Sequence, residues 1–502
     1  MKEEGNEEQN SQDDFEGYSK SAKIQLFGLF FCLGILNHLG IILVMTGGRL
    51  LTIELNMKPY VTIYTSVSTI FSIIIRMVNS RLCLKVSYKK RVIIICFWML
   101  FGYFSMFLVL TLHESILNGY NALCYILSFI PCFLLGASYA FGESAMIAYL
   151  RLFPKTLIAG WSSGTGVSGL VGGGLNLLTQ LLNGLTLKFL YLLLTPLGFV
   201  YLFLFLWTFK LLKKDQDSLI NEIIGDNQKE IEKDNINDNI NDDYKIMNDD
   251  QNNENNDDKH DKHIEIKNLN NNDNYVNNDD REKIDKIEEV KDDKLMDDMN
   301  KQNKTMSLIN FMAVMKMCGR VIINLGFIYF TYFISINSLV IRNSNKIDIP
   351  FLPKSTIDNK LVRRGKYEFI NEFFQFGMFT SKTFIKLVRK IQPIEVYTFA
   401  ITTITIIYFI EYYTGFLPWW CFPIVNYILG FFSGGTYAGG FYVILHSGQV
   451  LIDYKELTVN IATLFNDGGT FLSGLVGYWL LNHVIDSDEP FPGQEIEILK
   501  DS

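Results

Sequence analysis

The chain has 502 residues, 49% of them hydrophobic and 20% charged, and its formal net charge at pH 7 is −8. This length would allow two or three soluble domains, but the hydrophobic residues form long stretches and much of the acid lies in the N-terminus and one central block. The seven cysteines are scattered without a CxxC pair, which is typical of packing residues. The composition indicates a membrane protein and excludes the basic footprint of a nucleic-acid-binding protein.

Eleven stretches satisfy the requirement for a membrane-spanning helix, which needs about 20 mostly apolar residues. They lie near residues 24–46, 58–78, 92–113, 121–150, 157–181, 187–212, 307–336, 369–387, 393–415, 417–446 and 457–484. Glu372 and Lys382 interrupt the eighth stretch. The first stretch follows an acidic segment that lacks the basic n-region of a cleaved signal peptide, so we expect it to be retained.

The loops between these stretches alternate in their content of lysine and arginine, which is higher on the cytoplasmic side of a membrane. Basic residues follow the second, fourth and eighth stretches, whereas residues 114–120 and 414–418 contain none. This alternation predicts a cytoplasmic N-terminus. The segment 337–368 departs from the rule, because it would be non-cytoplasmic and yet contains Arg363 and Arg364.

A long Asn/Asp-rich segment divides the hydrophobic stretches into two groups. Its only aromatic residues are Tyr244 and Tyr275, so it cannot bury enough apolar surface to fold, and we predict a disordered cytoplasmic loop. His260 and His263 fit a solvated low-complexity run better than a metal site. The predicted organisation is a tail at 1–23, a six-helix lobe at 24–212, the loop at 213–306, a five-helix lobe at 307–484 and a tail at 485–502.

The two lobes resemble each other in the same sequence direction. SGLVG occurs at 168–172 and 473–477, LGASYAFGE from Leu135 matches LGFFSGGTY from Leu429, and LGILN from Leu33 matches LGFIY from Leu325. Glycine-rich apolar sequences also match by coincidence, but three matches in one order favour a parallel repeat. Major-facilitator transporters are built from such halves, with the substrate site between them near mid-membrane. We therefore predict an all-α, major-facilitator-like fold of about eleven transmembrane helices in two lobes.

The stretch GWSSGTGVSGLVGG, residues 160–173, concentrates glycines within a predicted span. Small residues let helices approach closely in lipid, where hydrophobic drive between helices is absent. Residues four apart share a helix face, and the stripe from Gly160 to Gly172 continues into the amides Asn176 and Gln180. The predicted helix-packing motif is Trp161, Ser162, Ser163, Gly164, Thr165, Gly166 and Gly169. Static packing and sliding of helices both remain open, whereas a phosphate loop is disfavoured because no P-loop lysine follows.

The block WSSGTGVSGLVGGGLNLLTQ is similar to a signature of the battenin family, the lysosomal membrane proteins of juvenile neuronal ceroid lipofuscinosis. LGILNHLGIILVMTG, LGASYAFGESAMIAYLRLFP and FNDGGTFLSGLVG resemble further family segments in the same order. The resemblance implies a major-facilitator protein of the lysosomal or vacuolar membrane, linked to glycerophosphodiester clearance, basic amino-acid handling and luminal pH. Two features depart from the family: YFTYF at 329–333 lacks the acidic residue usual there, and the C-terminal ILKDS lacks the prenylation box of some relatives.

Ionisable groups within spans are costly and usually face the bundle interior. Glu143 lies mid-span in the family's Gly-Glu motif, and we expect it either to exchange a proton or to form a structural pair with Arg76. Asp467 either belongs to the same pathway or caps a helix near its cytoplasmic end. His38 titrates near endolysosomal pH, although a packing histidine fits equally well.

The remaining candidates for the substrate or proton pathway are polar residues within the spans, namely Asn37, Asn176, Gln180, Tyr329 and Gln375. Lys316, Arg320 and Lys382 are cations that could hold an anionic phosphate. We expect Lys316 and Arg320 to extend to the membrane interface, because they lie near the cytoplasmic end of their span.

The hexamer DQDSLI directly follows the sixth stretch and resembles an acidic dileucine sorting signal. The family carries such a signal in the same loop, which implies adaptor coat proteins as partners of Asp215, Leu219 and Ile220. The spans contain no Ser–His–Asp constellation, metal cluster or nucleotide motif, so we predict neither enzymatic activity nor a cofactor.

We predict a multi-pass transporter of the lysosomal or vacuolar membrane that exports a small polar metabolite, such as a glycerophosphodiester or a basic amino acid, with protons as a possible coupling ion and a role in pH homeostasis. Two alternatives remain open. One is an equilibrative-type nucleoside transporter, which shares eleven spans and a long central loop. The other is a non-transporting membrane scaffold in trafficking or pH control.

Overall fold

A computed structural model describes residues 20–211 and 306–484 apart from short gaps in the connections. The helices of both predicted lobes belong to one compact unit, formed by residues 1–208 and 299–502. The predicted loop at 213–306, with its sorting residues Asp215, Leu219 and Ile220, lies outside the described residues except for Met306, as do residues 1–19 and 485–502.

The N-terminal lobe consists of helices that match the six predicted stretches. They are α2 (Lys20–Glu54), α3 (Ile63–Arg81), α4 (Tyr88–Ser115), α5 (Asn121–Leu127) with α6 (Phe129–Tyr149), α7 (Leu157–Leu181), and α8 (Leu187–Leu194) followed by a helix at 197–211. The fourth and sixth spans are each divided in two, near Pro131 and Pro196. Proline is tolerated in the first turn of a helix, because its missing N–H has no intrahelical partner there.

The C-terminal lobe begins with a long helical rod, α11 (Leu308–Ile334), which continues through a π-helical segment η4 (Ser335–Val340) into α12 (Ile341–Lys346). The remaining helices are α13 (Lys366–Thr383), α15 (Glu395–Thr414), α16 (Cys421–His446) and α17 (Lys455–His483). A two-stranded antiparallel hairpin, β1 (Lys354–Ile357) and β2 (Lys360–Arg363), precedes α13. The all-α prediction is therefore confirmed for the bundle, and the hairpin is an addition that the sequence patterns did not indicate.

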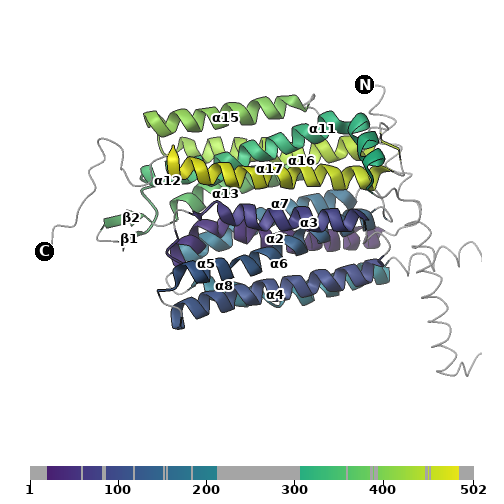
Figure 1. Ribbon diagram of the computed structural model, residues 1–502, viewed down its shortest axis with the longest axis horizontal. Helices are drawn as coiled ribbons and strands as arrows, with labels where there is room; N and C mark the ends of the chain where they lie inside the picture. Colours follow the sequence, from purple (N-terminus) through teal and green to yellow (C-terminus); the bar gives the residue numbers. More distant parts are fainter. Residues whose placement is uncertain are drawn as a thin grey trace, which may run out of the picture. The chain divides into compact units, whose positions relative to one another are not determined.

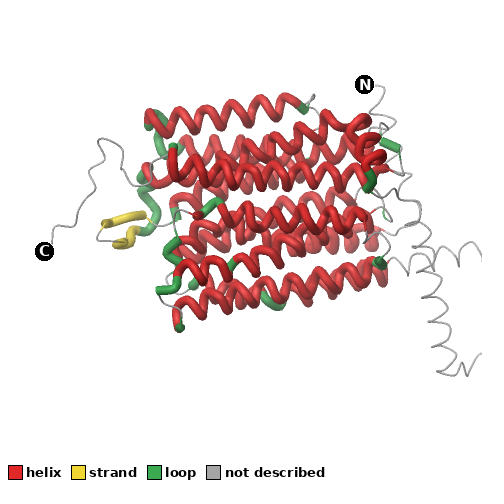
Figure 2. The backbone as a smooth tube through the Cα atoms, in the orientation of Figure 1, coloured by secondary structure: helices red, strands yellow, loops and turns green. Residues whose placement is uncertain are grey.

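The helices lie side by side in one bundle (Figures 1 and 2). Within the described residues, eight helical stretches are long and apolar enough to cross a membrane. α7, α13 and α17 are not among them, because glycine, hydroxyl and charged residues lower their hydropathy. All three helices bring polar side chains to the boundary between the lobes.

Helix pairing repeats between the lobes. In the N-terminal lobe α2 packs on α7 and α3 packs on α6; in the C-terminal lobe the equivalent helices pair as α11 with α17 and α13 with α16. Across the boundary α7 packs on α13 and α3 packs on α17. In the repeat α3 corresponds to α13 and α7 corresponds to α17, so each cross-boundary contact is the counterpart of the other. A parallel repeat related by a twofold axis requires this.

The glycines of α7 provide close contacts on two faces. A Cβ at Gly164 would collide with the carbonyl oxygen of Phe31 on α2, and a Cβ at Gly166 would lie 3.1 Å from the Phe379 Cα on α13. In the other lobe Gly469 of α17 has the same relation to the Gly326 carbonyl oxygen of α11. The glycine-rich stretch therefore lets α7 touch its own lobe and the opposite lobe at backbone distance, as small residues do in membrane bundles.

Candidate functional site

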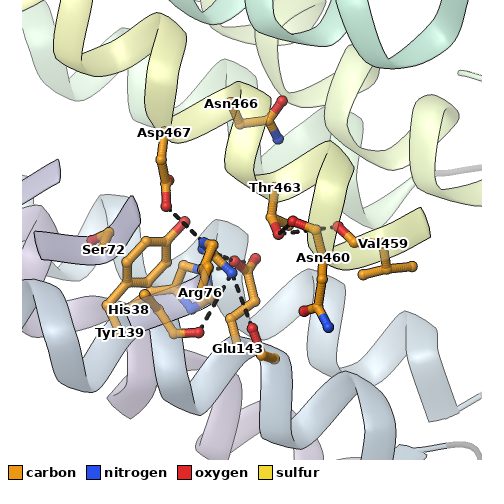
Figure 3. Close-up of polar contacts among 12 residues, drawn as sticks. His38, Ser72, Arg76, Tyr139, Glu143, Val459, Asn460, Thr463, Asn466 and Asp467 are labelled. Carbon is orange, nitrogen blue, oxygen red and sulfur yellow. Dashed lines mark hydrogen bonds and ion pairs between the residues drawn. The ribbon is translucent and has the colours of Figure 1, made fainter. Parts of the chain in front are cut away.

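One arginine at the centre of the bundle connects carboxylates of both lobes (Figure 3). Nη2 of Arg76 on α3 donates to Oε2 of Glu143 on α6 at 2.6 Å, and its Nε donates to Oδ2 of Asp467 on α17 at 2.6 Å. All three side chains are buried. Arg76 and Glu143 belong to the N-terminal lobe and Asp467 to the C-terminal lobe, so the guanidinium bridges the boundary between them.

The environment of Arg76 satisfies its remaining donor group. Nη1 lies 3.4 Å from the Ala140 carbonyl oxygen and 3.3 Å from the Ser144 hydroxyl. The guanidinium carbon lies 5.4 Å from the centre of the Tyr139 ring, within the range of a cation–π contact. Burying ions is costly unless their hydrogen-bonding groups are satisfied. Here Nε, Nη1 and Nη2 of Arg76 all have acceptors, and the guanidinium pairs with two carboxylates.

Further side chains complete a ring around the same carboxylate. The Tyr437 hydroxyl of α16 donates to Oε1 of Glu143 at 2.5 Å, and Nε2 of His38 on α2 lies 3.6 Å from that oxygen. The His38 ring stands edge-on to Trp161 of α7, with ring centres 6.0 Å apart. Nζ of Lys382 on α13 lies 4.6 Å from the Tyr437 ring centre and 3.5 Å from the Thr165 hydroxyl of α7. We call Glu143, His38, Trp161, Thr165, Lys382 and Tyr437 the central ring.

Two polar atoms of the central ring have no hydrogen-bond partner among the described residues. They are Nε1 of Trp161 and Nδ1 of His38, both fully buried. Lys382 is also buried, and within the described part of the chain no carboxylate lies within ion-pair distance of its ammonium group. Because buried polar groups are nearly always paired, these atoms are positions where a water molecule or the polar group of a ligand fits.

The two buried cations, Arg76 and Lys382, lie on equivalent helices of the repeat, α3 and α13. Arg76 contacts Glu143 through the α3–α6 pair, and Lys382 contacts Tyr437 through the equivalent α13–α16 pair. Glu143 and Tyr437 are also the last residues of the matched segments LGASYAFGE and LGFFSGGTY. Equivalent positions face each other when they lie close to a twofold axis, so the central ring lies where that axis passes between the lobes.

The other predicted pathway residues lie outside the central ring. Asn37 donates to the Tyr139 carbonyl oxygen at 3.2 Å. Asn176 donates to the Thr46 hydroxyl at 2.8 Å and thereby ties α7 to α2. Tyr329 packs against Tyr332 on α11, the buried Gln375 lies against Gly169 at the α7–α13 contact, and the Gln180 Cβ lies near Gly365. The contacts of Asn37 and Asn176 are within the N-terminal lobe, whereas Gln375 and Gln180 lie where α7 meets the other lobe.

The geometry bears on two of the open alternatives. Glu143 forms the pair with Arg76, and its exchange of a proton stays a prediction. Asp467 does not cap a helix, because α17 begins at Lys455 and Asp467 lies well inside it. Lys316 and Arg320 are exposed on α11, and Nε of Arg320 lies 2.5 Å from Oε1 of Glu395, which fits side chains extended to the interface.

Sequence reasoning did not select Tyr437 and considered Arg76 only as a partner of Glu143. Tyr437 carries a signal in the repeat, since it is the counterpart of Glu143 in the matched segments. Within the described residues no group of three or more His, Cys, Asp or Glu side chains is placed to hold a metal ion.

Comparisons with known proteins place these features in a family. Residues 28–487 match the family model described as CLN3 protein. The chain is also 29% identical over 140 residues to battenin of Dictyostelium discoideum, an alignment that covers 28% of this chain and 30% of that relative. The chain therefore aligns with less than a third of the length of this curated relative.

Solved structures share the fold. A D-xylose–proton symporter superimposes with a TM-score of 0.51 at 10% identity, covering 93% of this chain and 92% of the symporter. The POT family transporter PepTSo superimposes with a TM-score of 0.51 at 8% identity, covering 93% and 91%. Identities this low carry the fold alone, which is that of major-facilitator transporters. With its family match across nearly the whole sequence, the chain belongs to the CLN3 protein family, and it is a multi-pass membrane protein with the fold of major-facilitator transporters.

Proposed function

We propose that this protein exports a small polar metabolite from a lysosome or vacuole by alternating access, with coupling to protons. The observation that carries the proposal is Arg76, which joins Glu143 of one lobe to Asp467 of the other at the centre of a two-lobed transporter fold. The battenin relative and the sequence resemblance support the lysosomal or vacuolar membrane. A cytoplasmic N-terminus and sorting through Asp215, Leu219 and Ile220 remain predictions.

The geometry suggests how protons could couple to movement of the lobes. When the lobes separate at the centre, the ion pair of Arg76 with Glu143 persists because both residues belong to the same lobe. The ion pair of Arg76 with Asp467 breaks. A carboxylate left alone in a low-dielectric interior is strongly disfavoured relative to its neutral form. Uptake of a proton by Asp467 would then accompany opening, and its release would accompany the return of Arg76.

The central ring suggests the substrate class. Lys382 supplies a buried cation and Trp161 supplies an indole N–H, whereas the Thr165 hydroxyl already donates to the Ser162 carbonyl oxygen. The ammonium group and the indole N–H suit the phosphate of a glycerophosphodiester, because hydrogen bonds to an ionised acceptor are stronger than those between neutral groups. A basic amino acid would instead need Glu143, which already accepts from Arg76 and Tyr437. The ring therefore favours the anionic substrate of the two.

Transport by purified protein in liposomes tests the proposal. The panel contains glycerophosphodiesters, basic amino acids and nucleosides, each with an acidic or a neutral interior. We expect gradient-dependent transport of a glycerophosphodiester, lost in Glu143→Gln and in Lys382→Gln and kept in Lys316→Gln, whose side chain is exposed on α11.

Other outcomes separate the alternatives. Transport that does not depend on the proton gradient would support a carrier and would contradict coupling to protons. Transport of nucleosides alone would favour the equilibrative type. Absence of all transport by protein shown to be folded would favour the non-transporting scaffold.

A further inference from the structure

Glu372 on α13 is an acidic residue that neither the Arg76 ion pairs nor the central ring uses. Its side chain is partly buried, and its Oε2 is enclosed without a hydrogen-bond partner. Among the described residues no basic side chain forms an ion pair with it. Buried polar groups are nearly always paired, so the missing partner calls for an explanation.

The neighbouring Glu368 shows the usual arrangement on the same helix. It lies one turn earlier on α13, is buried, and pairs with Arg49 of α2, with 3.3 Å between Nη1 and Oε1. Positions four apart share a helix face, so both acidic residues lie on one side of α13. An ion pair stabilises the charged form of Glu368, whereas Glu372 has no such partner.

α7 meets the Glu372 carboxyl group with glycine backbone. A Cβ at Gly173 would collide with Oε2, and a Cβ at Gly174 would lie 3.7 Å from Oε1. Both glycines lie inside α7 (Leu157–Leu181), where the helix uses the backbone N–H groups for its own hydrogen bonds. The carboxyl group therefore lies against a surface that offers it no hydrogen-bond donor.

The charged groups around α13 contact other partners. α13 packs on α7, α16 and α12. α7 has no ionisable side chain, the α16 tyrosine Tyr427 lies beside Phe376 with ring centres 5.6 Å apart, and Arg342 of α12 does not pair with Glu372. The other contacts are Arg49 with Glu368, Lys366 with the Ile347 carbonyl oxygen, Lys346 with the Tyr412 carbonyl oxygen, and Lys382 with Thr165 and Tyr437.

This environment links the charge of Glu372 to the contact between the lobes. An anion against an apolar surface without donors is strongly disfavoured relative to the neutral acid. α7 and α13 belong to different lobes, so alternating access requires their contact to open. When the helices part, water reaches the carboxyl group and stabilises the anion. Closing of the contact therefore favours uptake of a proton.

We propose that Glu372 is a proton-binding site separate from Asp467 and from the central ring. It holds a proton while α7 and α13 are in contact and releases it when they part. The two sites have opposite signs, because Asp467 takes up a proton when its own cross-boundary contact opens. The inference rests on the movement of the lobes in the proposed function, but it does not depend on the substrate.

Carbodiimide labelling of the full chain in nanodiscs tests the site. Dicyclohexylcarbodiimide is apolar and reacts with neutral carboxylic acids. The acid proton moves to a carbodiimide nitrogen, the carboxyl oxygen adds to the central carbon, and acyl migration gives a stable N-acylurea. At about pH 7.5 we expect Glu372 to be labelled about tenfold more than Glu368, the ratio for one unit of difference in proton affinity. Glu372→Gln should lose this label, and equal labelling of the two residues would overturn the proposal.

Disulfide formation across the boundary tests the link to closing. Asn337 of η4 donates to the Thr65 hydroxyl of α3 at 3.1 Å, so a Thr65→Cys/Asn337→Cys pair in a variant without other cysteines reports this contact. Its rate of oxidation is compared with and without Glu372→Gln, which imitates the protonated acid. We expect the glutamine variant to be faster by about tenfold at pH 8 and equal at pH 5.5.

Controls separate this proposal from the proposed function. Glu395→Gln alters an exposed ion pair and should leave the oxidation rate unchanged at both pH values. Equal rates with and without Glu372→Gln at pH 8 would overturn the link to closing. Neither readout requires transport, so a protein that gives both expected results and transports nothing would support this site and contradict the proposed function.

Discussion

At the scale of single residues, the centre of this protein depends on one cation shared by two anions. Arg76 lies between Glu143 and Asp467, and all three side chains are buried. The sequence singled out both carboxylates, because ionisable groups in apolar spans are rare and costly. It could not show that one arginine joins them, since their spans lie far apart in the chain and only packing of α3 against α6 and α17 brings them together.

Loss of this arginine should destabilise the fold, because both carboxylates would remain buried without their partner. We expect Arg76→Met to lower the free energy of unfolding by about 3–5 kcal/mol. The triple variant Arg76→Met/Glu143→Gln/Asp467→Asn should recover most of that loss, since it leaves no unpaired charge. Thermal or denaturant unfolding in detergent measures both. A triple variant as unstable as the single one would show that the ion pairs are not the cause.

At the scale of helices, glycine sets how closely neighbours approach. Gly469 of α17 faces the Gly326 carbonyl oxygen, whereas the adjacent Gly468 has open space where a Cβ would lie. The sequence showed a glycine-rich stripe on α7, and helical spacing gave its face. It did not show that α7 uses two faces, one against α2 and one against α13, because that depends on which helices surround it.

This contrast gives a matched pair of variants on consecutive residues. Gly469→Ala should destabilise the protein by about 1–3 kcal/mol through overpacking. Gly468→Ala should be neutral or stabilising by up to about 1 kcal/mol, because alanine favours helix and meets nothing. Unfolding midpoints of the two variants check this expectation, and equal midpoints would contradict the close approach of α17 to α11.

At the scale of the whole bundle, two lobes meet through α3–α17 and α7–α13. Alternating access requires these contacts to change at one end while they hold at the other. Among the cross-boundary contacts, Asn337 of η4 donates to the Thr65 hydroxyl of α3 at 3.1 Å, and Arg49 pairs with Glu368 at the same end of the helices. These contacts close one end of the boundary in this structure.

A covalent bond between the lobes should therefore stop transport. In a variant whose seven native cysteines are replaced by serine, we expect the Thr65→Cys/Asn337→Cys pair to abolish transport when oxidised and to restore it when reduced. The control pair Ser335→Cys/Thr405→Cys joins side chains 2.7 Å apart within the C-terminal lobe and should leave transport unchanged. Full transport by the oxidised Thr65–Asn337 pair would exclude rocking of the lobes at this contact.

The sequence by itself determined the bundle, the two-lobed repeat and the family, because hydropathy, glycine spacing and the WSSGTG block are local properties of the chain. Only the tertiary structure decided which polar residues share a site. Glu143, His38, Trp161, Thr165, Lys382 and Tyr437 come from five helices, and their meeting depends on helix rotation and on the twofold relation of the lobes. The same dependence explains why Asn176 and Gln180 lie outside the ring: spacing places a residue on a helix face, but the neighbouring helices decide what that face meets.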